Sequence, residues 1–435
     1  MRDGAETVLL MIATWLLGAT AVPIDFRKNA AERTSLAREF GLTAIIEDRR
    51  MPAAEYDSIV ADAAWTDLVV QHDGSPISTA GDGPVAAAVI SLTSGTTARP
   101  IGILLDHERM LLRSICDIPL LYGESLLNPL PLSFSGSRSH TFSALLNGSA
   151  VFFHPVLFSA EAFAEAILSW KVTSVCAVPT IIRNLIELFR GRSPPAFDQL
   201  HALYSIGAPM LPEEKRQTRT VLCKNFVEDY GSSLSGRISS LYGSDLDARA
   251  DTVGRVMPFV ALQIVDADDA VLPFGETGII RVRTPGMARA IYGDTTRASG
   301  DILKKGWAYP GDIGMIEKGF LRLSGRTSEL IIRGGVNVHP SEVESVIAEH
   351  EGVRDVAVVG YPKLPEGQEI AAFVVPSDNL TEAVLIAHCR ARLSPDKRPR
   401  KFVFIKELPL NDNGKISRAE LRRQLETGAF SLAHH

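Results

Sequence analysis

The sequence is poor in cysteine, carries no strong charge of either sign and has no apolar run long enough to cross a membrane. Four cysteines are scattered over 435 residues without a CxxC pair. This spacing argues against a zinc site or a disulfide framework, so we expect no metal site built from cysteine and a cytoplasmic, reducing compartment. The formal net charge of −6 gives no electrostatic case for binding nucleic acid or an anionic membrane.

The apolar stretch near the N-terminus, VLLMIATWLLGATAVP at residues 8–23, is too short to span a bilayer. A signal peptide is the alternative. Asp3 and Glu6 are unusual in the front region of such a peptide, and no convincing cleavage site follows. We therefore expect a buried helix followed by a strand, and no stable membrane anchor.

The order of secondary structure predicts an α/β protein. Strand-like runs at residues 42–48, 150–156 and 172–179 alternate with helical periodicity, which is typical of layered α/β units with a largely parallel sheet. From about Val253 the pattern indicates a more antiparallel, β-rich region. We expect a large N-terminal domain over residues 1–326 and a small, mobile α+β C-terminal domain over residues 327–435.

Within the second domain, SEVE at residues 341–344 predicts the start of a helix. Ser341 would be the N-cap and Glu344 would occupy the capping-box position.

The hydroxyl-rich stretch SLTSGTTARPIG at residues 91–102 follows AAVISL, residues 87–92, which is typical of a buried strand. Successive backbone N–H groups and hydroxyls in such a loop favour a bound phosphate. The alternative is a flexible surface loop. The order GxxxxGK[ST] of a Walker loop is absent, and Ile101 stands where a phosphate loop often carries a cation.

Six further segments follow in order and point to one family. They are GAPMLP (207–212), EDYGSS (228–233), GETGIIRVRTPG (275–286), WAYPGDIG (307–314), GRTSELIIRGGVNVHPSEVE (325–344) and LNDNGKISR (410–418). Together with the hydroxyl-rich loop, this series resembles the adenylate-forming superfamily of acyl- and aryl-CoA synthetases, luciferases and peptide-synthetase adenylation domains. The resemblance extends from about residue 5 to about residue 425.

The resemblance implies an AMP-forming acid–thiol ligase. Such an enzyme uses ATP to turn a carboxylic acid, here aliphatic or aromatic, into an acyl-adenylate, and then transfers the acyl group to CoA. A separate acyl carrier protein is the alternative acceptor.

The same resemblance assigns roles to individual residues. It implies catalytic roles for Lys415 and Ser233. It implies nucleotide binding by Thr93, Ser94, Gly95, Thr96, Thr97, Gly207, Ala208, Pro209, Asp229, Tyr230, Gly231, Asp312 and Arg326. Candidates for the acyl pocket are Ser135, Gly136, His140 and Ile206, with His140 in a structural rather than a catalytic role. Gly334 and Gly335 are candidates for the CoA tunnel.

Several positions depart from the family pattern. Ala98 replaces a glycine, Ile101 replaces a lysine, and Leu234 replaces the acidic residue that helps hold Mg²⁺ in the family. Ser328 stands at the hinge, where Asp or Lys is usual. Mg²⁺ is therefore expected as a cofactor without its usual ligand.

The chain also reaches the first family element, Gly18 to Asp25, sooner than is usual, so we expect part of the first subdomain to be missing. These departures keep a second hypothesis open, namely a catalytically degenerate protein that binds a nucleotide or acyl-adenylate and acts through a partner.

Overall fold

The computed structural model describes residues 4–72, 74, 83, 86–93, 100–117, 123–155, 158–292, 302–334, 336–363, 367–377, 380–410 and 416–428. Contacts between residues divide the chain into two compact units. The first unit contains Met1–Ala250, Gly254–Leu262 and Val282–Pro310. The second unit contains Asp251–Val253, Gln263–Arg281 and Gly311–His435. The boundary between residues 326 and 327 stays a prediction.

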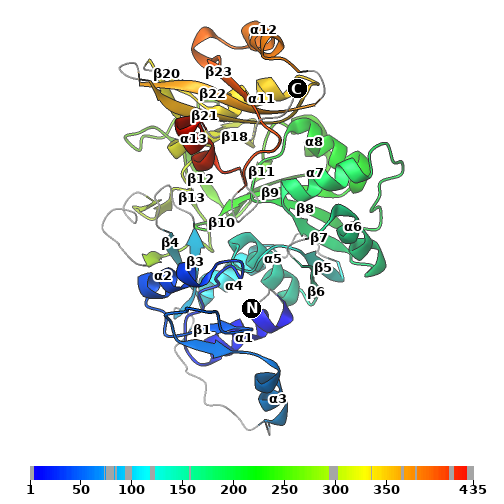
Figure 1. The fold of residues 1–435 in the computed structure, drawn as a ribbon, viewed down its shortest axis with the longest axis vertical. Coiled ribbons are helices and arrows are strands. Elements are labelled where there is room, and N and C mark those ends of the chain that lie inside the picture. Colours follow the sequence, from blue (N-terminus) through cyan, green and yellow to red (C-terminus); the bar gives the residue numbers. More distant parts are fainter. Residues whose placement is uncertain are drawn as a thin grey trace. The chain divides into compact units, whose positions relative to one another are not determined.

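The first unit contains a mainly parallel sheet in the order β6-β5-β7-β8-β9 (Figure 1). Its strands are β5 (Ser125–Asn128), β6 (Ala150–Phe153), β7 (Ser174–Ala177), β8 (Ala202–Ile206) and β9 (Phe226–Ser232). Every residue of β5, β7 and β8 is buried, which is why these segments lack polar alternation. The predicted parallel α/β arrangement is confirmed. Two antiparallel strands extend this sheet beyond β9, namely β10 (Gly236–Tyr242) and β11 (Arg255–Val256).

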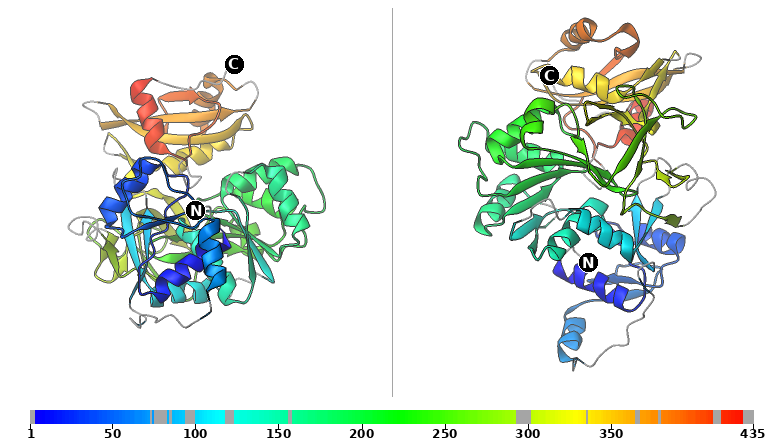
Figure 2. Two further views of the ribbon diagram at one scale, coloured as in Figure 1. Left: turned by 60° about the horizontal axis from the view of Figure 1, so that its bottom comes forward. Right: turned by 180° about the vertical axis from the view of Figure 1, so that it is seen from behind.

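Helices cover both faces of this sheet. On one face, Phe163 and Ile182 of α6 and α7 pack against Leu127, Val175 and Leu203 of the strands. On the other face, α5 contributes to a second core with β5, β7 and β8. The two faces can be followed in the views of Figure 2. The helices of the first unit are α1 (Ala5–Leu16), α2 (Ala30–Phe40), α3 (Ala63–Gln71), α4 (His107–Asp117), α5 (Ser135–Leu146), α6 (Ala160–Ser169), α7 (Pro179–Leu188), α8 (Pro212–Gln217), the π-helix η1 (Thr218–Leu222) and α9 (Gly243–Arg249).

Two short sheets and a strand pair at the end of the long sheet complete the first unit. β3 (Ala87–Thr93), β4 (Ile101–Asp106) and β14 (Ala290–Tyr292) form an antiparallel sheet in the order β14-β4-β3. β1 (Ile45–Glu47) pairs with β2 (Ser58–Val60) in parallel, and β15 (Leu303–Lys304) pairs with β16 (Trp307–Ala308). The predicted strand at 87–92 is therefore β3.

The N-terminal apolar stretch forms α1, with Val8 and Met11 buried. Leu9 and Leu16 on the same helix are exposed, so the helix is only half buried. The chain after α1 makes an isolated bridge from Ala21 to Val89 instead of the expected strand. Across the described part of the chain, every helix is too short or too polar to cross a membrane.

The second unit begins with antiparallel strands, as the β-rich pattern from Val253 predicts. They are β12 (Ala261–Val265), β13 (Gly278–Arg283), β17 (Asp312–Glu317) and β18 (Phe320–Arg326). The first two residues of β12 and the last two of β13 are assigned to the first unit. The 3₁₀ turn η2 (Thr327–Glu329) follows β18.

The rest of the second unit is an α+β sandwich around a sheet in the order β20-β19-β22-β21, with β23 beside β22. Helices α11 and α12 pack on one face through Val343 and Leu385, and α13 packs on the other through Leu421. The elements are β19 (Ile331–Arg333), β20 (Val336–Val338), α11 (Pro340–Ala348), β21 (Val353–Lys363), β22 (Gly367–Pro376), α12 (Glu382–Arg392), η3 (Pro395–Lys397), β23 (Lys401–Phe404) and α13 (Arg418–Thr427).

The predicted start of α11 is wrong. The helix begins at Pro340 after the N-cap residue His339, which makes no side-chain capping bond. Ser341 Oγ donates to the carbonyl of Ser324 instead. Glu344 is paired with Arg418 at 2.6 Å, so a long-range ion pair takes the place of the expected capping box.

Candidate active site

The hydroxyl-rich loop leaves the sheet between β3 and β4. Thr93 pairs with Ile101 in the antiparallel register, and Thr93 Oγ1 donates to the Ile101 carbonyl at 3.4 Å. The two ends of the loop are thus held side by side. Ser94, Gly95, Thr96, Thr97 and Ala98 lie outside the described residues, so the phosphate contacts predicted for the first four stay predictions.

The predicted adenine-side segments meet at one end of the parallel sheet. Ile206 at the end of β8 is in register with Asp229 of β9. Gly207 follows β8 with a φ of 94°, a left-handed conformation that glycine adopts without strain. The loop with Gly207, Ala208 and Pro209 therefore leaves the sheet beside Asp229, Tyr230 and Gly231. This is the edge at which parallel α/β sheets bind ligands.

A buried ion pair lies next to this edge of the sheet. Lys215 Nζ lies 2.5 Å from Glu228 Oε2, and both side chains are almost fully buried. The other carboxylate oxygen of Glu228 accepts the backbone N–H of Met210 at 2.9 Å. Burial raises the pKa of Glu228, and the adjacent ammonium of Lys215 opposes that rise. The pair fixes the chain that follows Pro209.

The candidates for the acyl pocket lie on the neighbouring helix α5, close to the same sheet. A Cβ added to Gly136 would come within 2.9 Å of Ile206 Cδ1, so α5 approaches the end of β8 very closely. The His140 ring packs against the Tyr204 ring of β8 in a tilted arrangement, with centroids 5.2 Å apart. Ser135 begins α5 and is buried. The structure thus brings the four predicted acyl-pocket residues together around the end of β8.

His140 lies in a buried polar cluster with Asp229. Its Nε2 atom is 3.8 Å from Asp229 Oδ2, and Arg237 Nη1 lies 3.5 Å from the same oxygen. Ser240 Oγ donates to the other oxygen of Asp229. Burial, with a further contribution from the nearby Arg237 charge, lowers the pKa of His140 to about 3. His140 is therefore neutral at physiological pH, which agrees with a structural role.

The turn between β9 and β10 carries the candidate catalytic residue Ser233. A Cβ on Gly231 would lie 2.5 Å from the Gly236 carbonyl, so the two strands approach each other too closely for any side chain there. Ser232 Oγ lies 2.8 Å from Ser235 Oγ and accepts the backbone N–H of Ser235 at 3.1 Å, which closes the turn. Ser233 and Leu234 lie between these anchors.

The residues around Leu234 do not fit a bound Mg²⁺ at this turn. The Leu234 side chain is buried, and its carbonyl accepts the Ala288 N–H at 2.8 Å. Asp245, the nearest acidic residue downstream, is paired with Arg255 at 2.7 Å. Among the described residues there is no cluster of three or more His, Cys, Asp or Glu side chains that could hold a metal ion.

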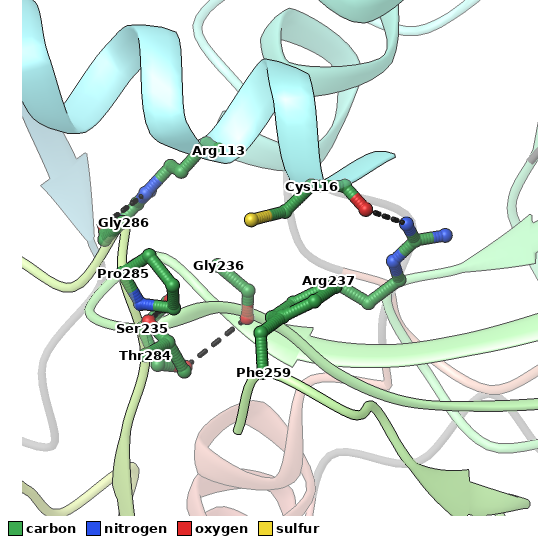
Figure 3. A pocket seen from close by; sticks show the side chains of 9 residues that line it. All are labelled: Arg113, Cys116, Ser235, Gly236, Arg237, Phe259, Thr284, Pro285 and Gly286. Atoms are coloured by element: carbon green, nitrogen blue, oxygen red, sulfur yellow. Dashed lines mark hydrogen bonds between the residues drawn. The ribbon is translucent and has the colours of Figure 1, made fainter. Parts of the chain in front are cut away.

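Two arginines near this turn are outside every motif and were missed by sequence reasoning. Arg237 follows the EDYGSS segment, and Arg113 lies on α4. Both guanidinium groups are buried, and both line the small pocket shown in Figure 3. The sequence offered one indication of the role of Arg113, namely its position after three apolar residues of α4. This indication did not identify the groups that its guanidinium contacts.

In the second unit, the structure brings together Asp312 and Arg326. They begin β17 and end β18 and are paired in register, and Arg326 Nε donates to Asp312 Oδ1 at 3.0 Å. Gly311 precedes Asp312 with a φ of 82°, and its carbonyl accepts the Thr327 N–H at 2.9 Å. This bond ties the start of η2, which contains Ser328, to the predicted ribose-binding aspartate.

Other predicted residues of the second unit are described only in part. Gly334, between β19 and β20, has a φ of 55° and open space where a Cβ would lie. Gly335 and Lys415 lie outside the described residues. The chain on either side of residues 411–415 is held by an antiparallel bridge between Leu410 and Ile416.

Comparison with known proteins identifies the class of enzyme. The profile of the AMP-binding enzyme family matches residues 1–292, and that of the AMP-binding enzyme C-terminal domain matches residues 342–415. The chain belongs to the AMP-binding enzyme family, so the predicted adenylate-forming fold and superfamily are confirmed.

Relatives of this chain are CoA ligases, as the sequence predicts for the enzyme class. The chain is 30% identical to the indoleacetate–CoA ligase of Aromatoleum aromaticum, over 98% of this chain and 88% of that protein. It is also 30% identical to the long-chain-fatty-acid–CoA ligase FadD13 of Mycobacterium tuberculosis, over 98% and 87% of the two chains. Among solved structures, o-succinylbenzoate CoA synthetase of Bacillus subtilis, in complex with its acyl-adenylate intermediate, matches with a TM-score of 0.84 and 25% identity. That match covers 99% of this chain and 88% of the other.

Proposed function

We propose that the protein is an ATP-dependent, AMP-forming ligase that joins a carboxylic acid to CoA. One observation carries the proposal: Ile206 at the end of β8 is in register with Asp229 on the nucleotide side, and its Cδ1 atom lies so close to Gly136 on the acid side that a Cβ there would come within 2.9 Å. The end of one strand therefore borders both predicted subsites. A carboxylate bound beside α5 would face a nucleotide bound along the Gly207–Pro209 loop.

The proposed reaction has two steps. In the first, a carboxylate oxygen of the acid attacks the α-phosphorus of ATP, the bond to the β-phosphate breaks, and pyrophosphate leaves. Negative charge builds on the α-phosphate, so donors fixed near it lower the barrier. Ser233 and Lys415 are the proposed donors.

In the second step, the sulfur of CoA attacks the acyl carbon and AMP leaves. The thiol must lose its proton during this step. His140 is an unsuitable base, because its buried ring has a pKa of about 3. We therefore propose that the proton passes to solvent or to the leaving phosphate. Gly334 and Gly335 are the proposed glycines beside the CoA arm.

Asp312 and Arg326 are proposed to hold the ribose. The Asp312 side chain is largely buried and is oriented by the Arg326 guanidinium at 3.0 Å. A carboxylate held in this way accepts hydrogen bonds from two neighbouring hydroxyl groups. The division into an AMP-binding domain of residues 1–326 and a mobile domain of residues 327–435 is part of the same proposal, as is a cytoplasmic location.

The second candidate function is nucleotide or acyl-adenylate binding without adenylation. The buried, apolar Leu234 favours it, because the turn offers no carboxylate to a metal ion. Transfer of the acyl group to a carrier protein instead of CoA is a variant of the first function.

The decisive experiment measures acid-dependent exchange of pyrophosphate into ATP over a panel of aliphatic and aromatic acids, with and without Mg²⁺. The wild type should exchange with at least one acid, and Lys415→Ala should abolish this exchange. Lys406→Ala, which removes an exposed lysine of the same unit, is the matched control and should retain it. Titration of ATP and AMP into the protein runs in parallel.

Binding of AMP without exchange for any acid would favour the second candidate function. With an acid identified, thioester formation is then compared between CoA and a phosphopantetheinylated carrier protein, which separates the two acceptors.

A further inference from the structure

Arg113 on α4 connects four segments that are far apart in the sequence. Its side chain is buried. Its guanidinium donates to the hydroxyl of Ser135 and to the carbonyls of Ser233 and Gly286. Arg113 lies outside every motif segment named in the sequence analysis. Its contacts nevertheless reach the turn with the candidate catalytic Ser233 and the start of the helix with the candidate acyl pocket.

The guanidinium holds the turn through its carbonyl groups. Nη2 donates to the carbonyl of Ser233 at 2.9 Å and to that of Leu234 at 3.1 Å. These residues lie in the turn between β9 and β10, outside the strand register, and the Leu234 carbonyl also accepts the Ala288 N–H at 2.8 Å. A charged donor in a buried setting makes stronger hydrogen bonds than a neutral one, so Arg113 restrains the position of Ser233.

Two further contacts of the same group fix its own position. Nε donates to the Gly286 carbonyl at 2.7 Å, as Figure 3 shows, and Nη1 lies 3.4 Å from Ser135 Oγ. The planar fork of an arginine directs these donors along fixed lines. Arg113 thus lies between the turn of Ser233 and the first residue of α5.

Gly286 leaves room for this side chain, and Gly236 lies beside it. A Cβ on Gly286 would lie 2.4 Å from Arg113 Cγ, which is closer than any real contact. Gly236 has a φ of 77°, and a Cβ there would lie 3.4 Å from the same carbon. Position 286 therefore requires glycine while Arg113 occupies this path, and the α4 backbone adds to the restriction, because Arg113 N would lie 3.1 Å from the same Cβ.

We propose that Arg113 is a positioning residue for adenylation, which holds the Ser233 turn at a fixed distance from the start of the acyl helix α5. The inference rests on the proposed ligase function. The guanidinium of Arg113 binds the carbonyls of Ser233 and Leu234 in this turn. The side chains around Leu234 do not form a metal site there. Loss of Arg113 would leave the nucleotide and acid subsites in place. Ser233, the proposed α-phosphate donor, would no longer be held at a fixed distance from the acid.

The test compares Arg113→Met and Arg113→Lys with the wild type in pyrophosphate exchange. Misplacement of a catalytic group by about 1 Å costs on the order of 100-fold in rate, so Arg113→Met should lose roughly 30- to 100-fold in kcat. The KM for the acid should change much less, because the lost restraint acts on the transition state. Arg113→Lys should recover only part of kcat, because an ammonium does not reproduce the fork. Arg109→Lys, one turn earlier on α4, is the control and should keep wild-type kcat.

A double-mutant cycle separates positioning from general damage. Gly286→Ala should displace Arg113 and lower kcat. Combined with Arg113→Ala, which removes the Cγ that the new Cβ would meet, it should give a double variant no slower than the slower single variant. Additive losses, or wild-type kcat in Arg113→Met, would overturn the proposal.

Amide hydrogen exchange gives a readout that does not depend on activity. Backbone amides of residues 233–236 should exchange at least tenfold faster in Arg113→Met than in the wild type, while those of β7 and β8 should be unchanged. Unchanged exchange at the turn refutes the inference about Arg113 even if the wild type has no ligase activity. Faster exchange at the turn in Arg113→Met, combined with a wild type that shows no pyrophosphate exchange, would refute the ligase proposal and leave the structural role of Arg113 intact.

Discussion

The neutral, buried His140 makes the stability of the first unit fall as the pH drops below neutral. In the folded protein the pKa of this ring is about 3, compared with 6.5 for an ordinary histidine, because burial and the nearby Arg237 disfavour its charged form. Below pH 6.5 the unfolded chain therefore takes up a proton that the folded chain does not bind. Stabilisation by neutral His140 is fully present above this pH and decreases as the pH falls towards 3.

The size of the effect follows from proton linkage. Between about pH 7.5 and about pH 5 the unfolded histidine becomes almost fully protonated and the folded one does not, which costs about 2 kcal/mol of unfolding free energy. His140→Gln keeps a polar side chain at this position but cannot titrate. The variant should therefore lose about 2 kcal/mol less than the wild type over this pH range.

Urea unfolding followed by tryptophan fluorescence suits this measurement. All four tryptophans, Trp15, Trp65, Trp170 and Trp307, belong to the first unit, which also contains His140. His72→Gln, which replaces an exposed histidine of the same unit, is the control and should keep the wild-type pH dependence. Equal pH dependence in the wild type and His140→Gln would refute the reasoning that His140 is kept neutral by burial.

Two further predictions concern packing and thiol chemistry. Gly254→Ala should lower the unfolding free energy by on the order of 3–5 kcal/mol, because the new Cβ would lie 1.9 Å from the Ser240 carbonyl at a φ of 84°; an unchanged urea midpoint would contradict this. Iodoacetamide at about pH 8 should alkylate the partly exposed Cys116 well before Cys223 and Cys389, because burial raises the pKa of both latter thiols to about 11. Mass spectrometry of tryptic peptides gives the order, and equal rates for the three thiols would show that burial does not protect them.

The sequence by itself determined the class of fold and the family. Patterns of apolar residues predicted β3 and the alternation of β6, β7, α6 and α7, because burial on a sheet or helix face imposes a period that is visible over a few residues. Motif order identified the adenylate-forming family for the same local reason, since each motif is a short segment with its own turn and side chains.

Only the tertiary structure decided which residues meet. Arg113 donates to the carbonyls of Ser233 and Leu234, which lie 120 and 121 positions further along the chain. No local sequence pattern encodes this pairing. Glu344 was expected to cap its own helix, but a partner 74 residues away, Arg418, binds it instead. A capping bond and a buried ion pair compete for the same carboxylate, and the outcome depends on which groups the packed chain brings within reach and removes from water.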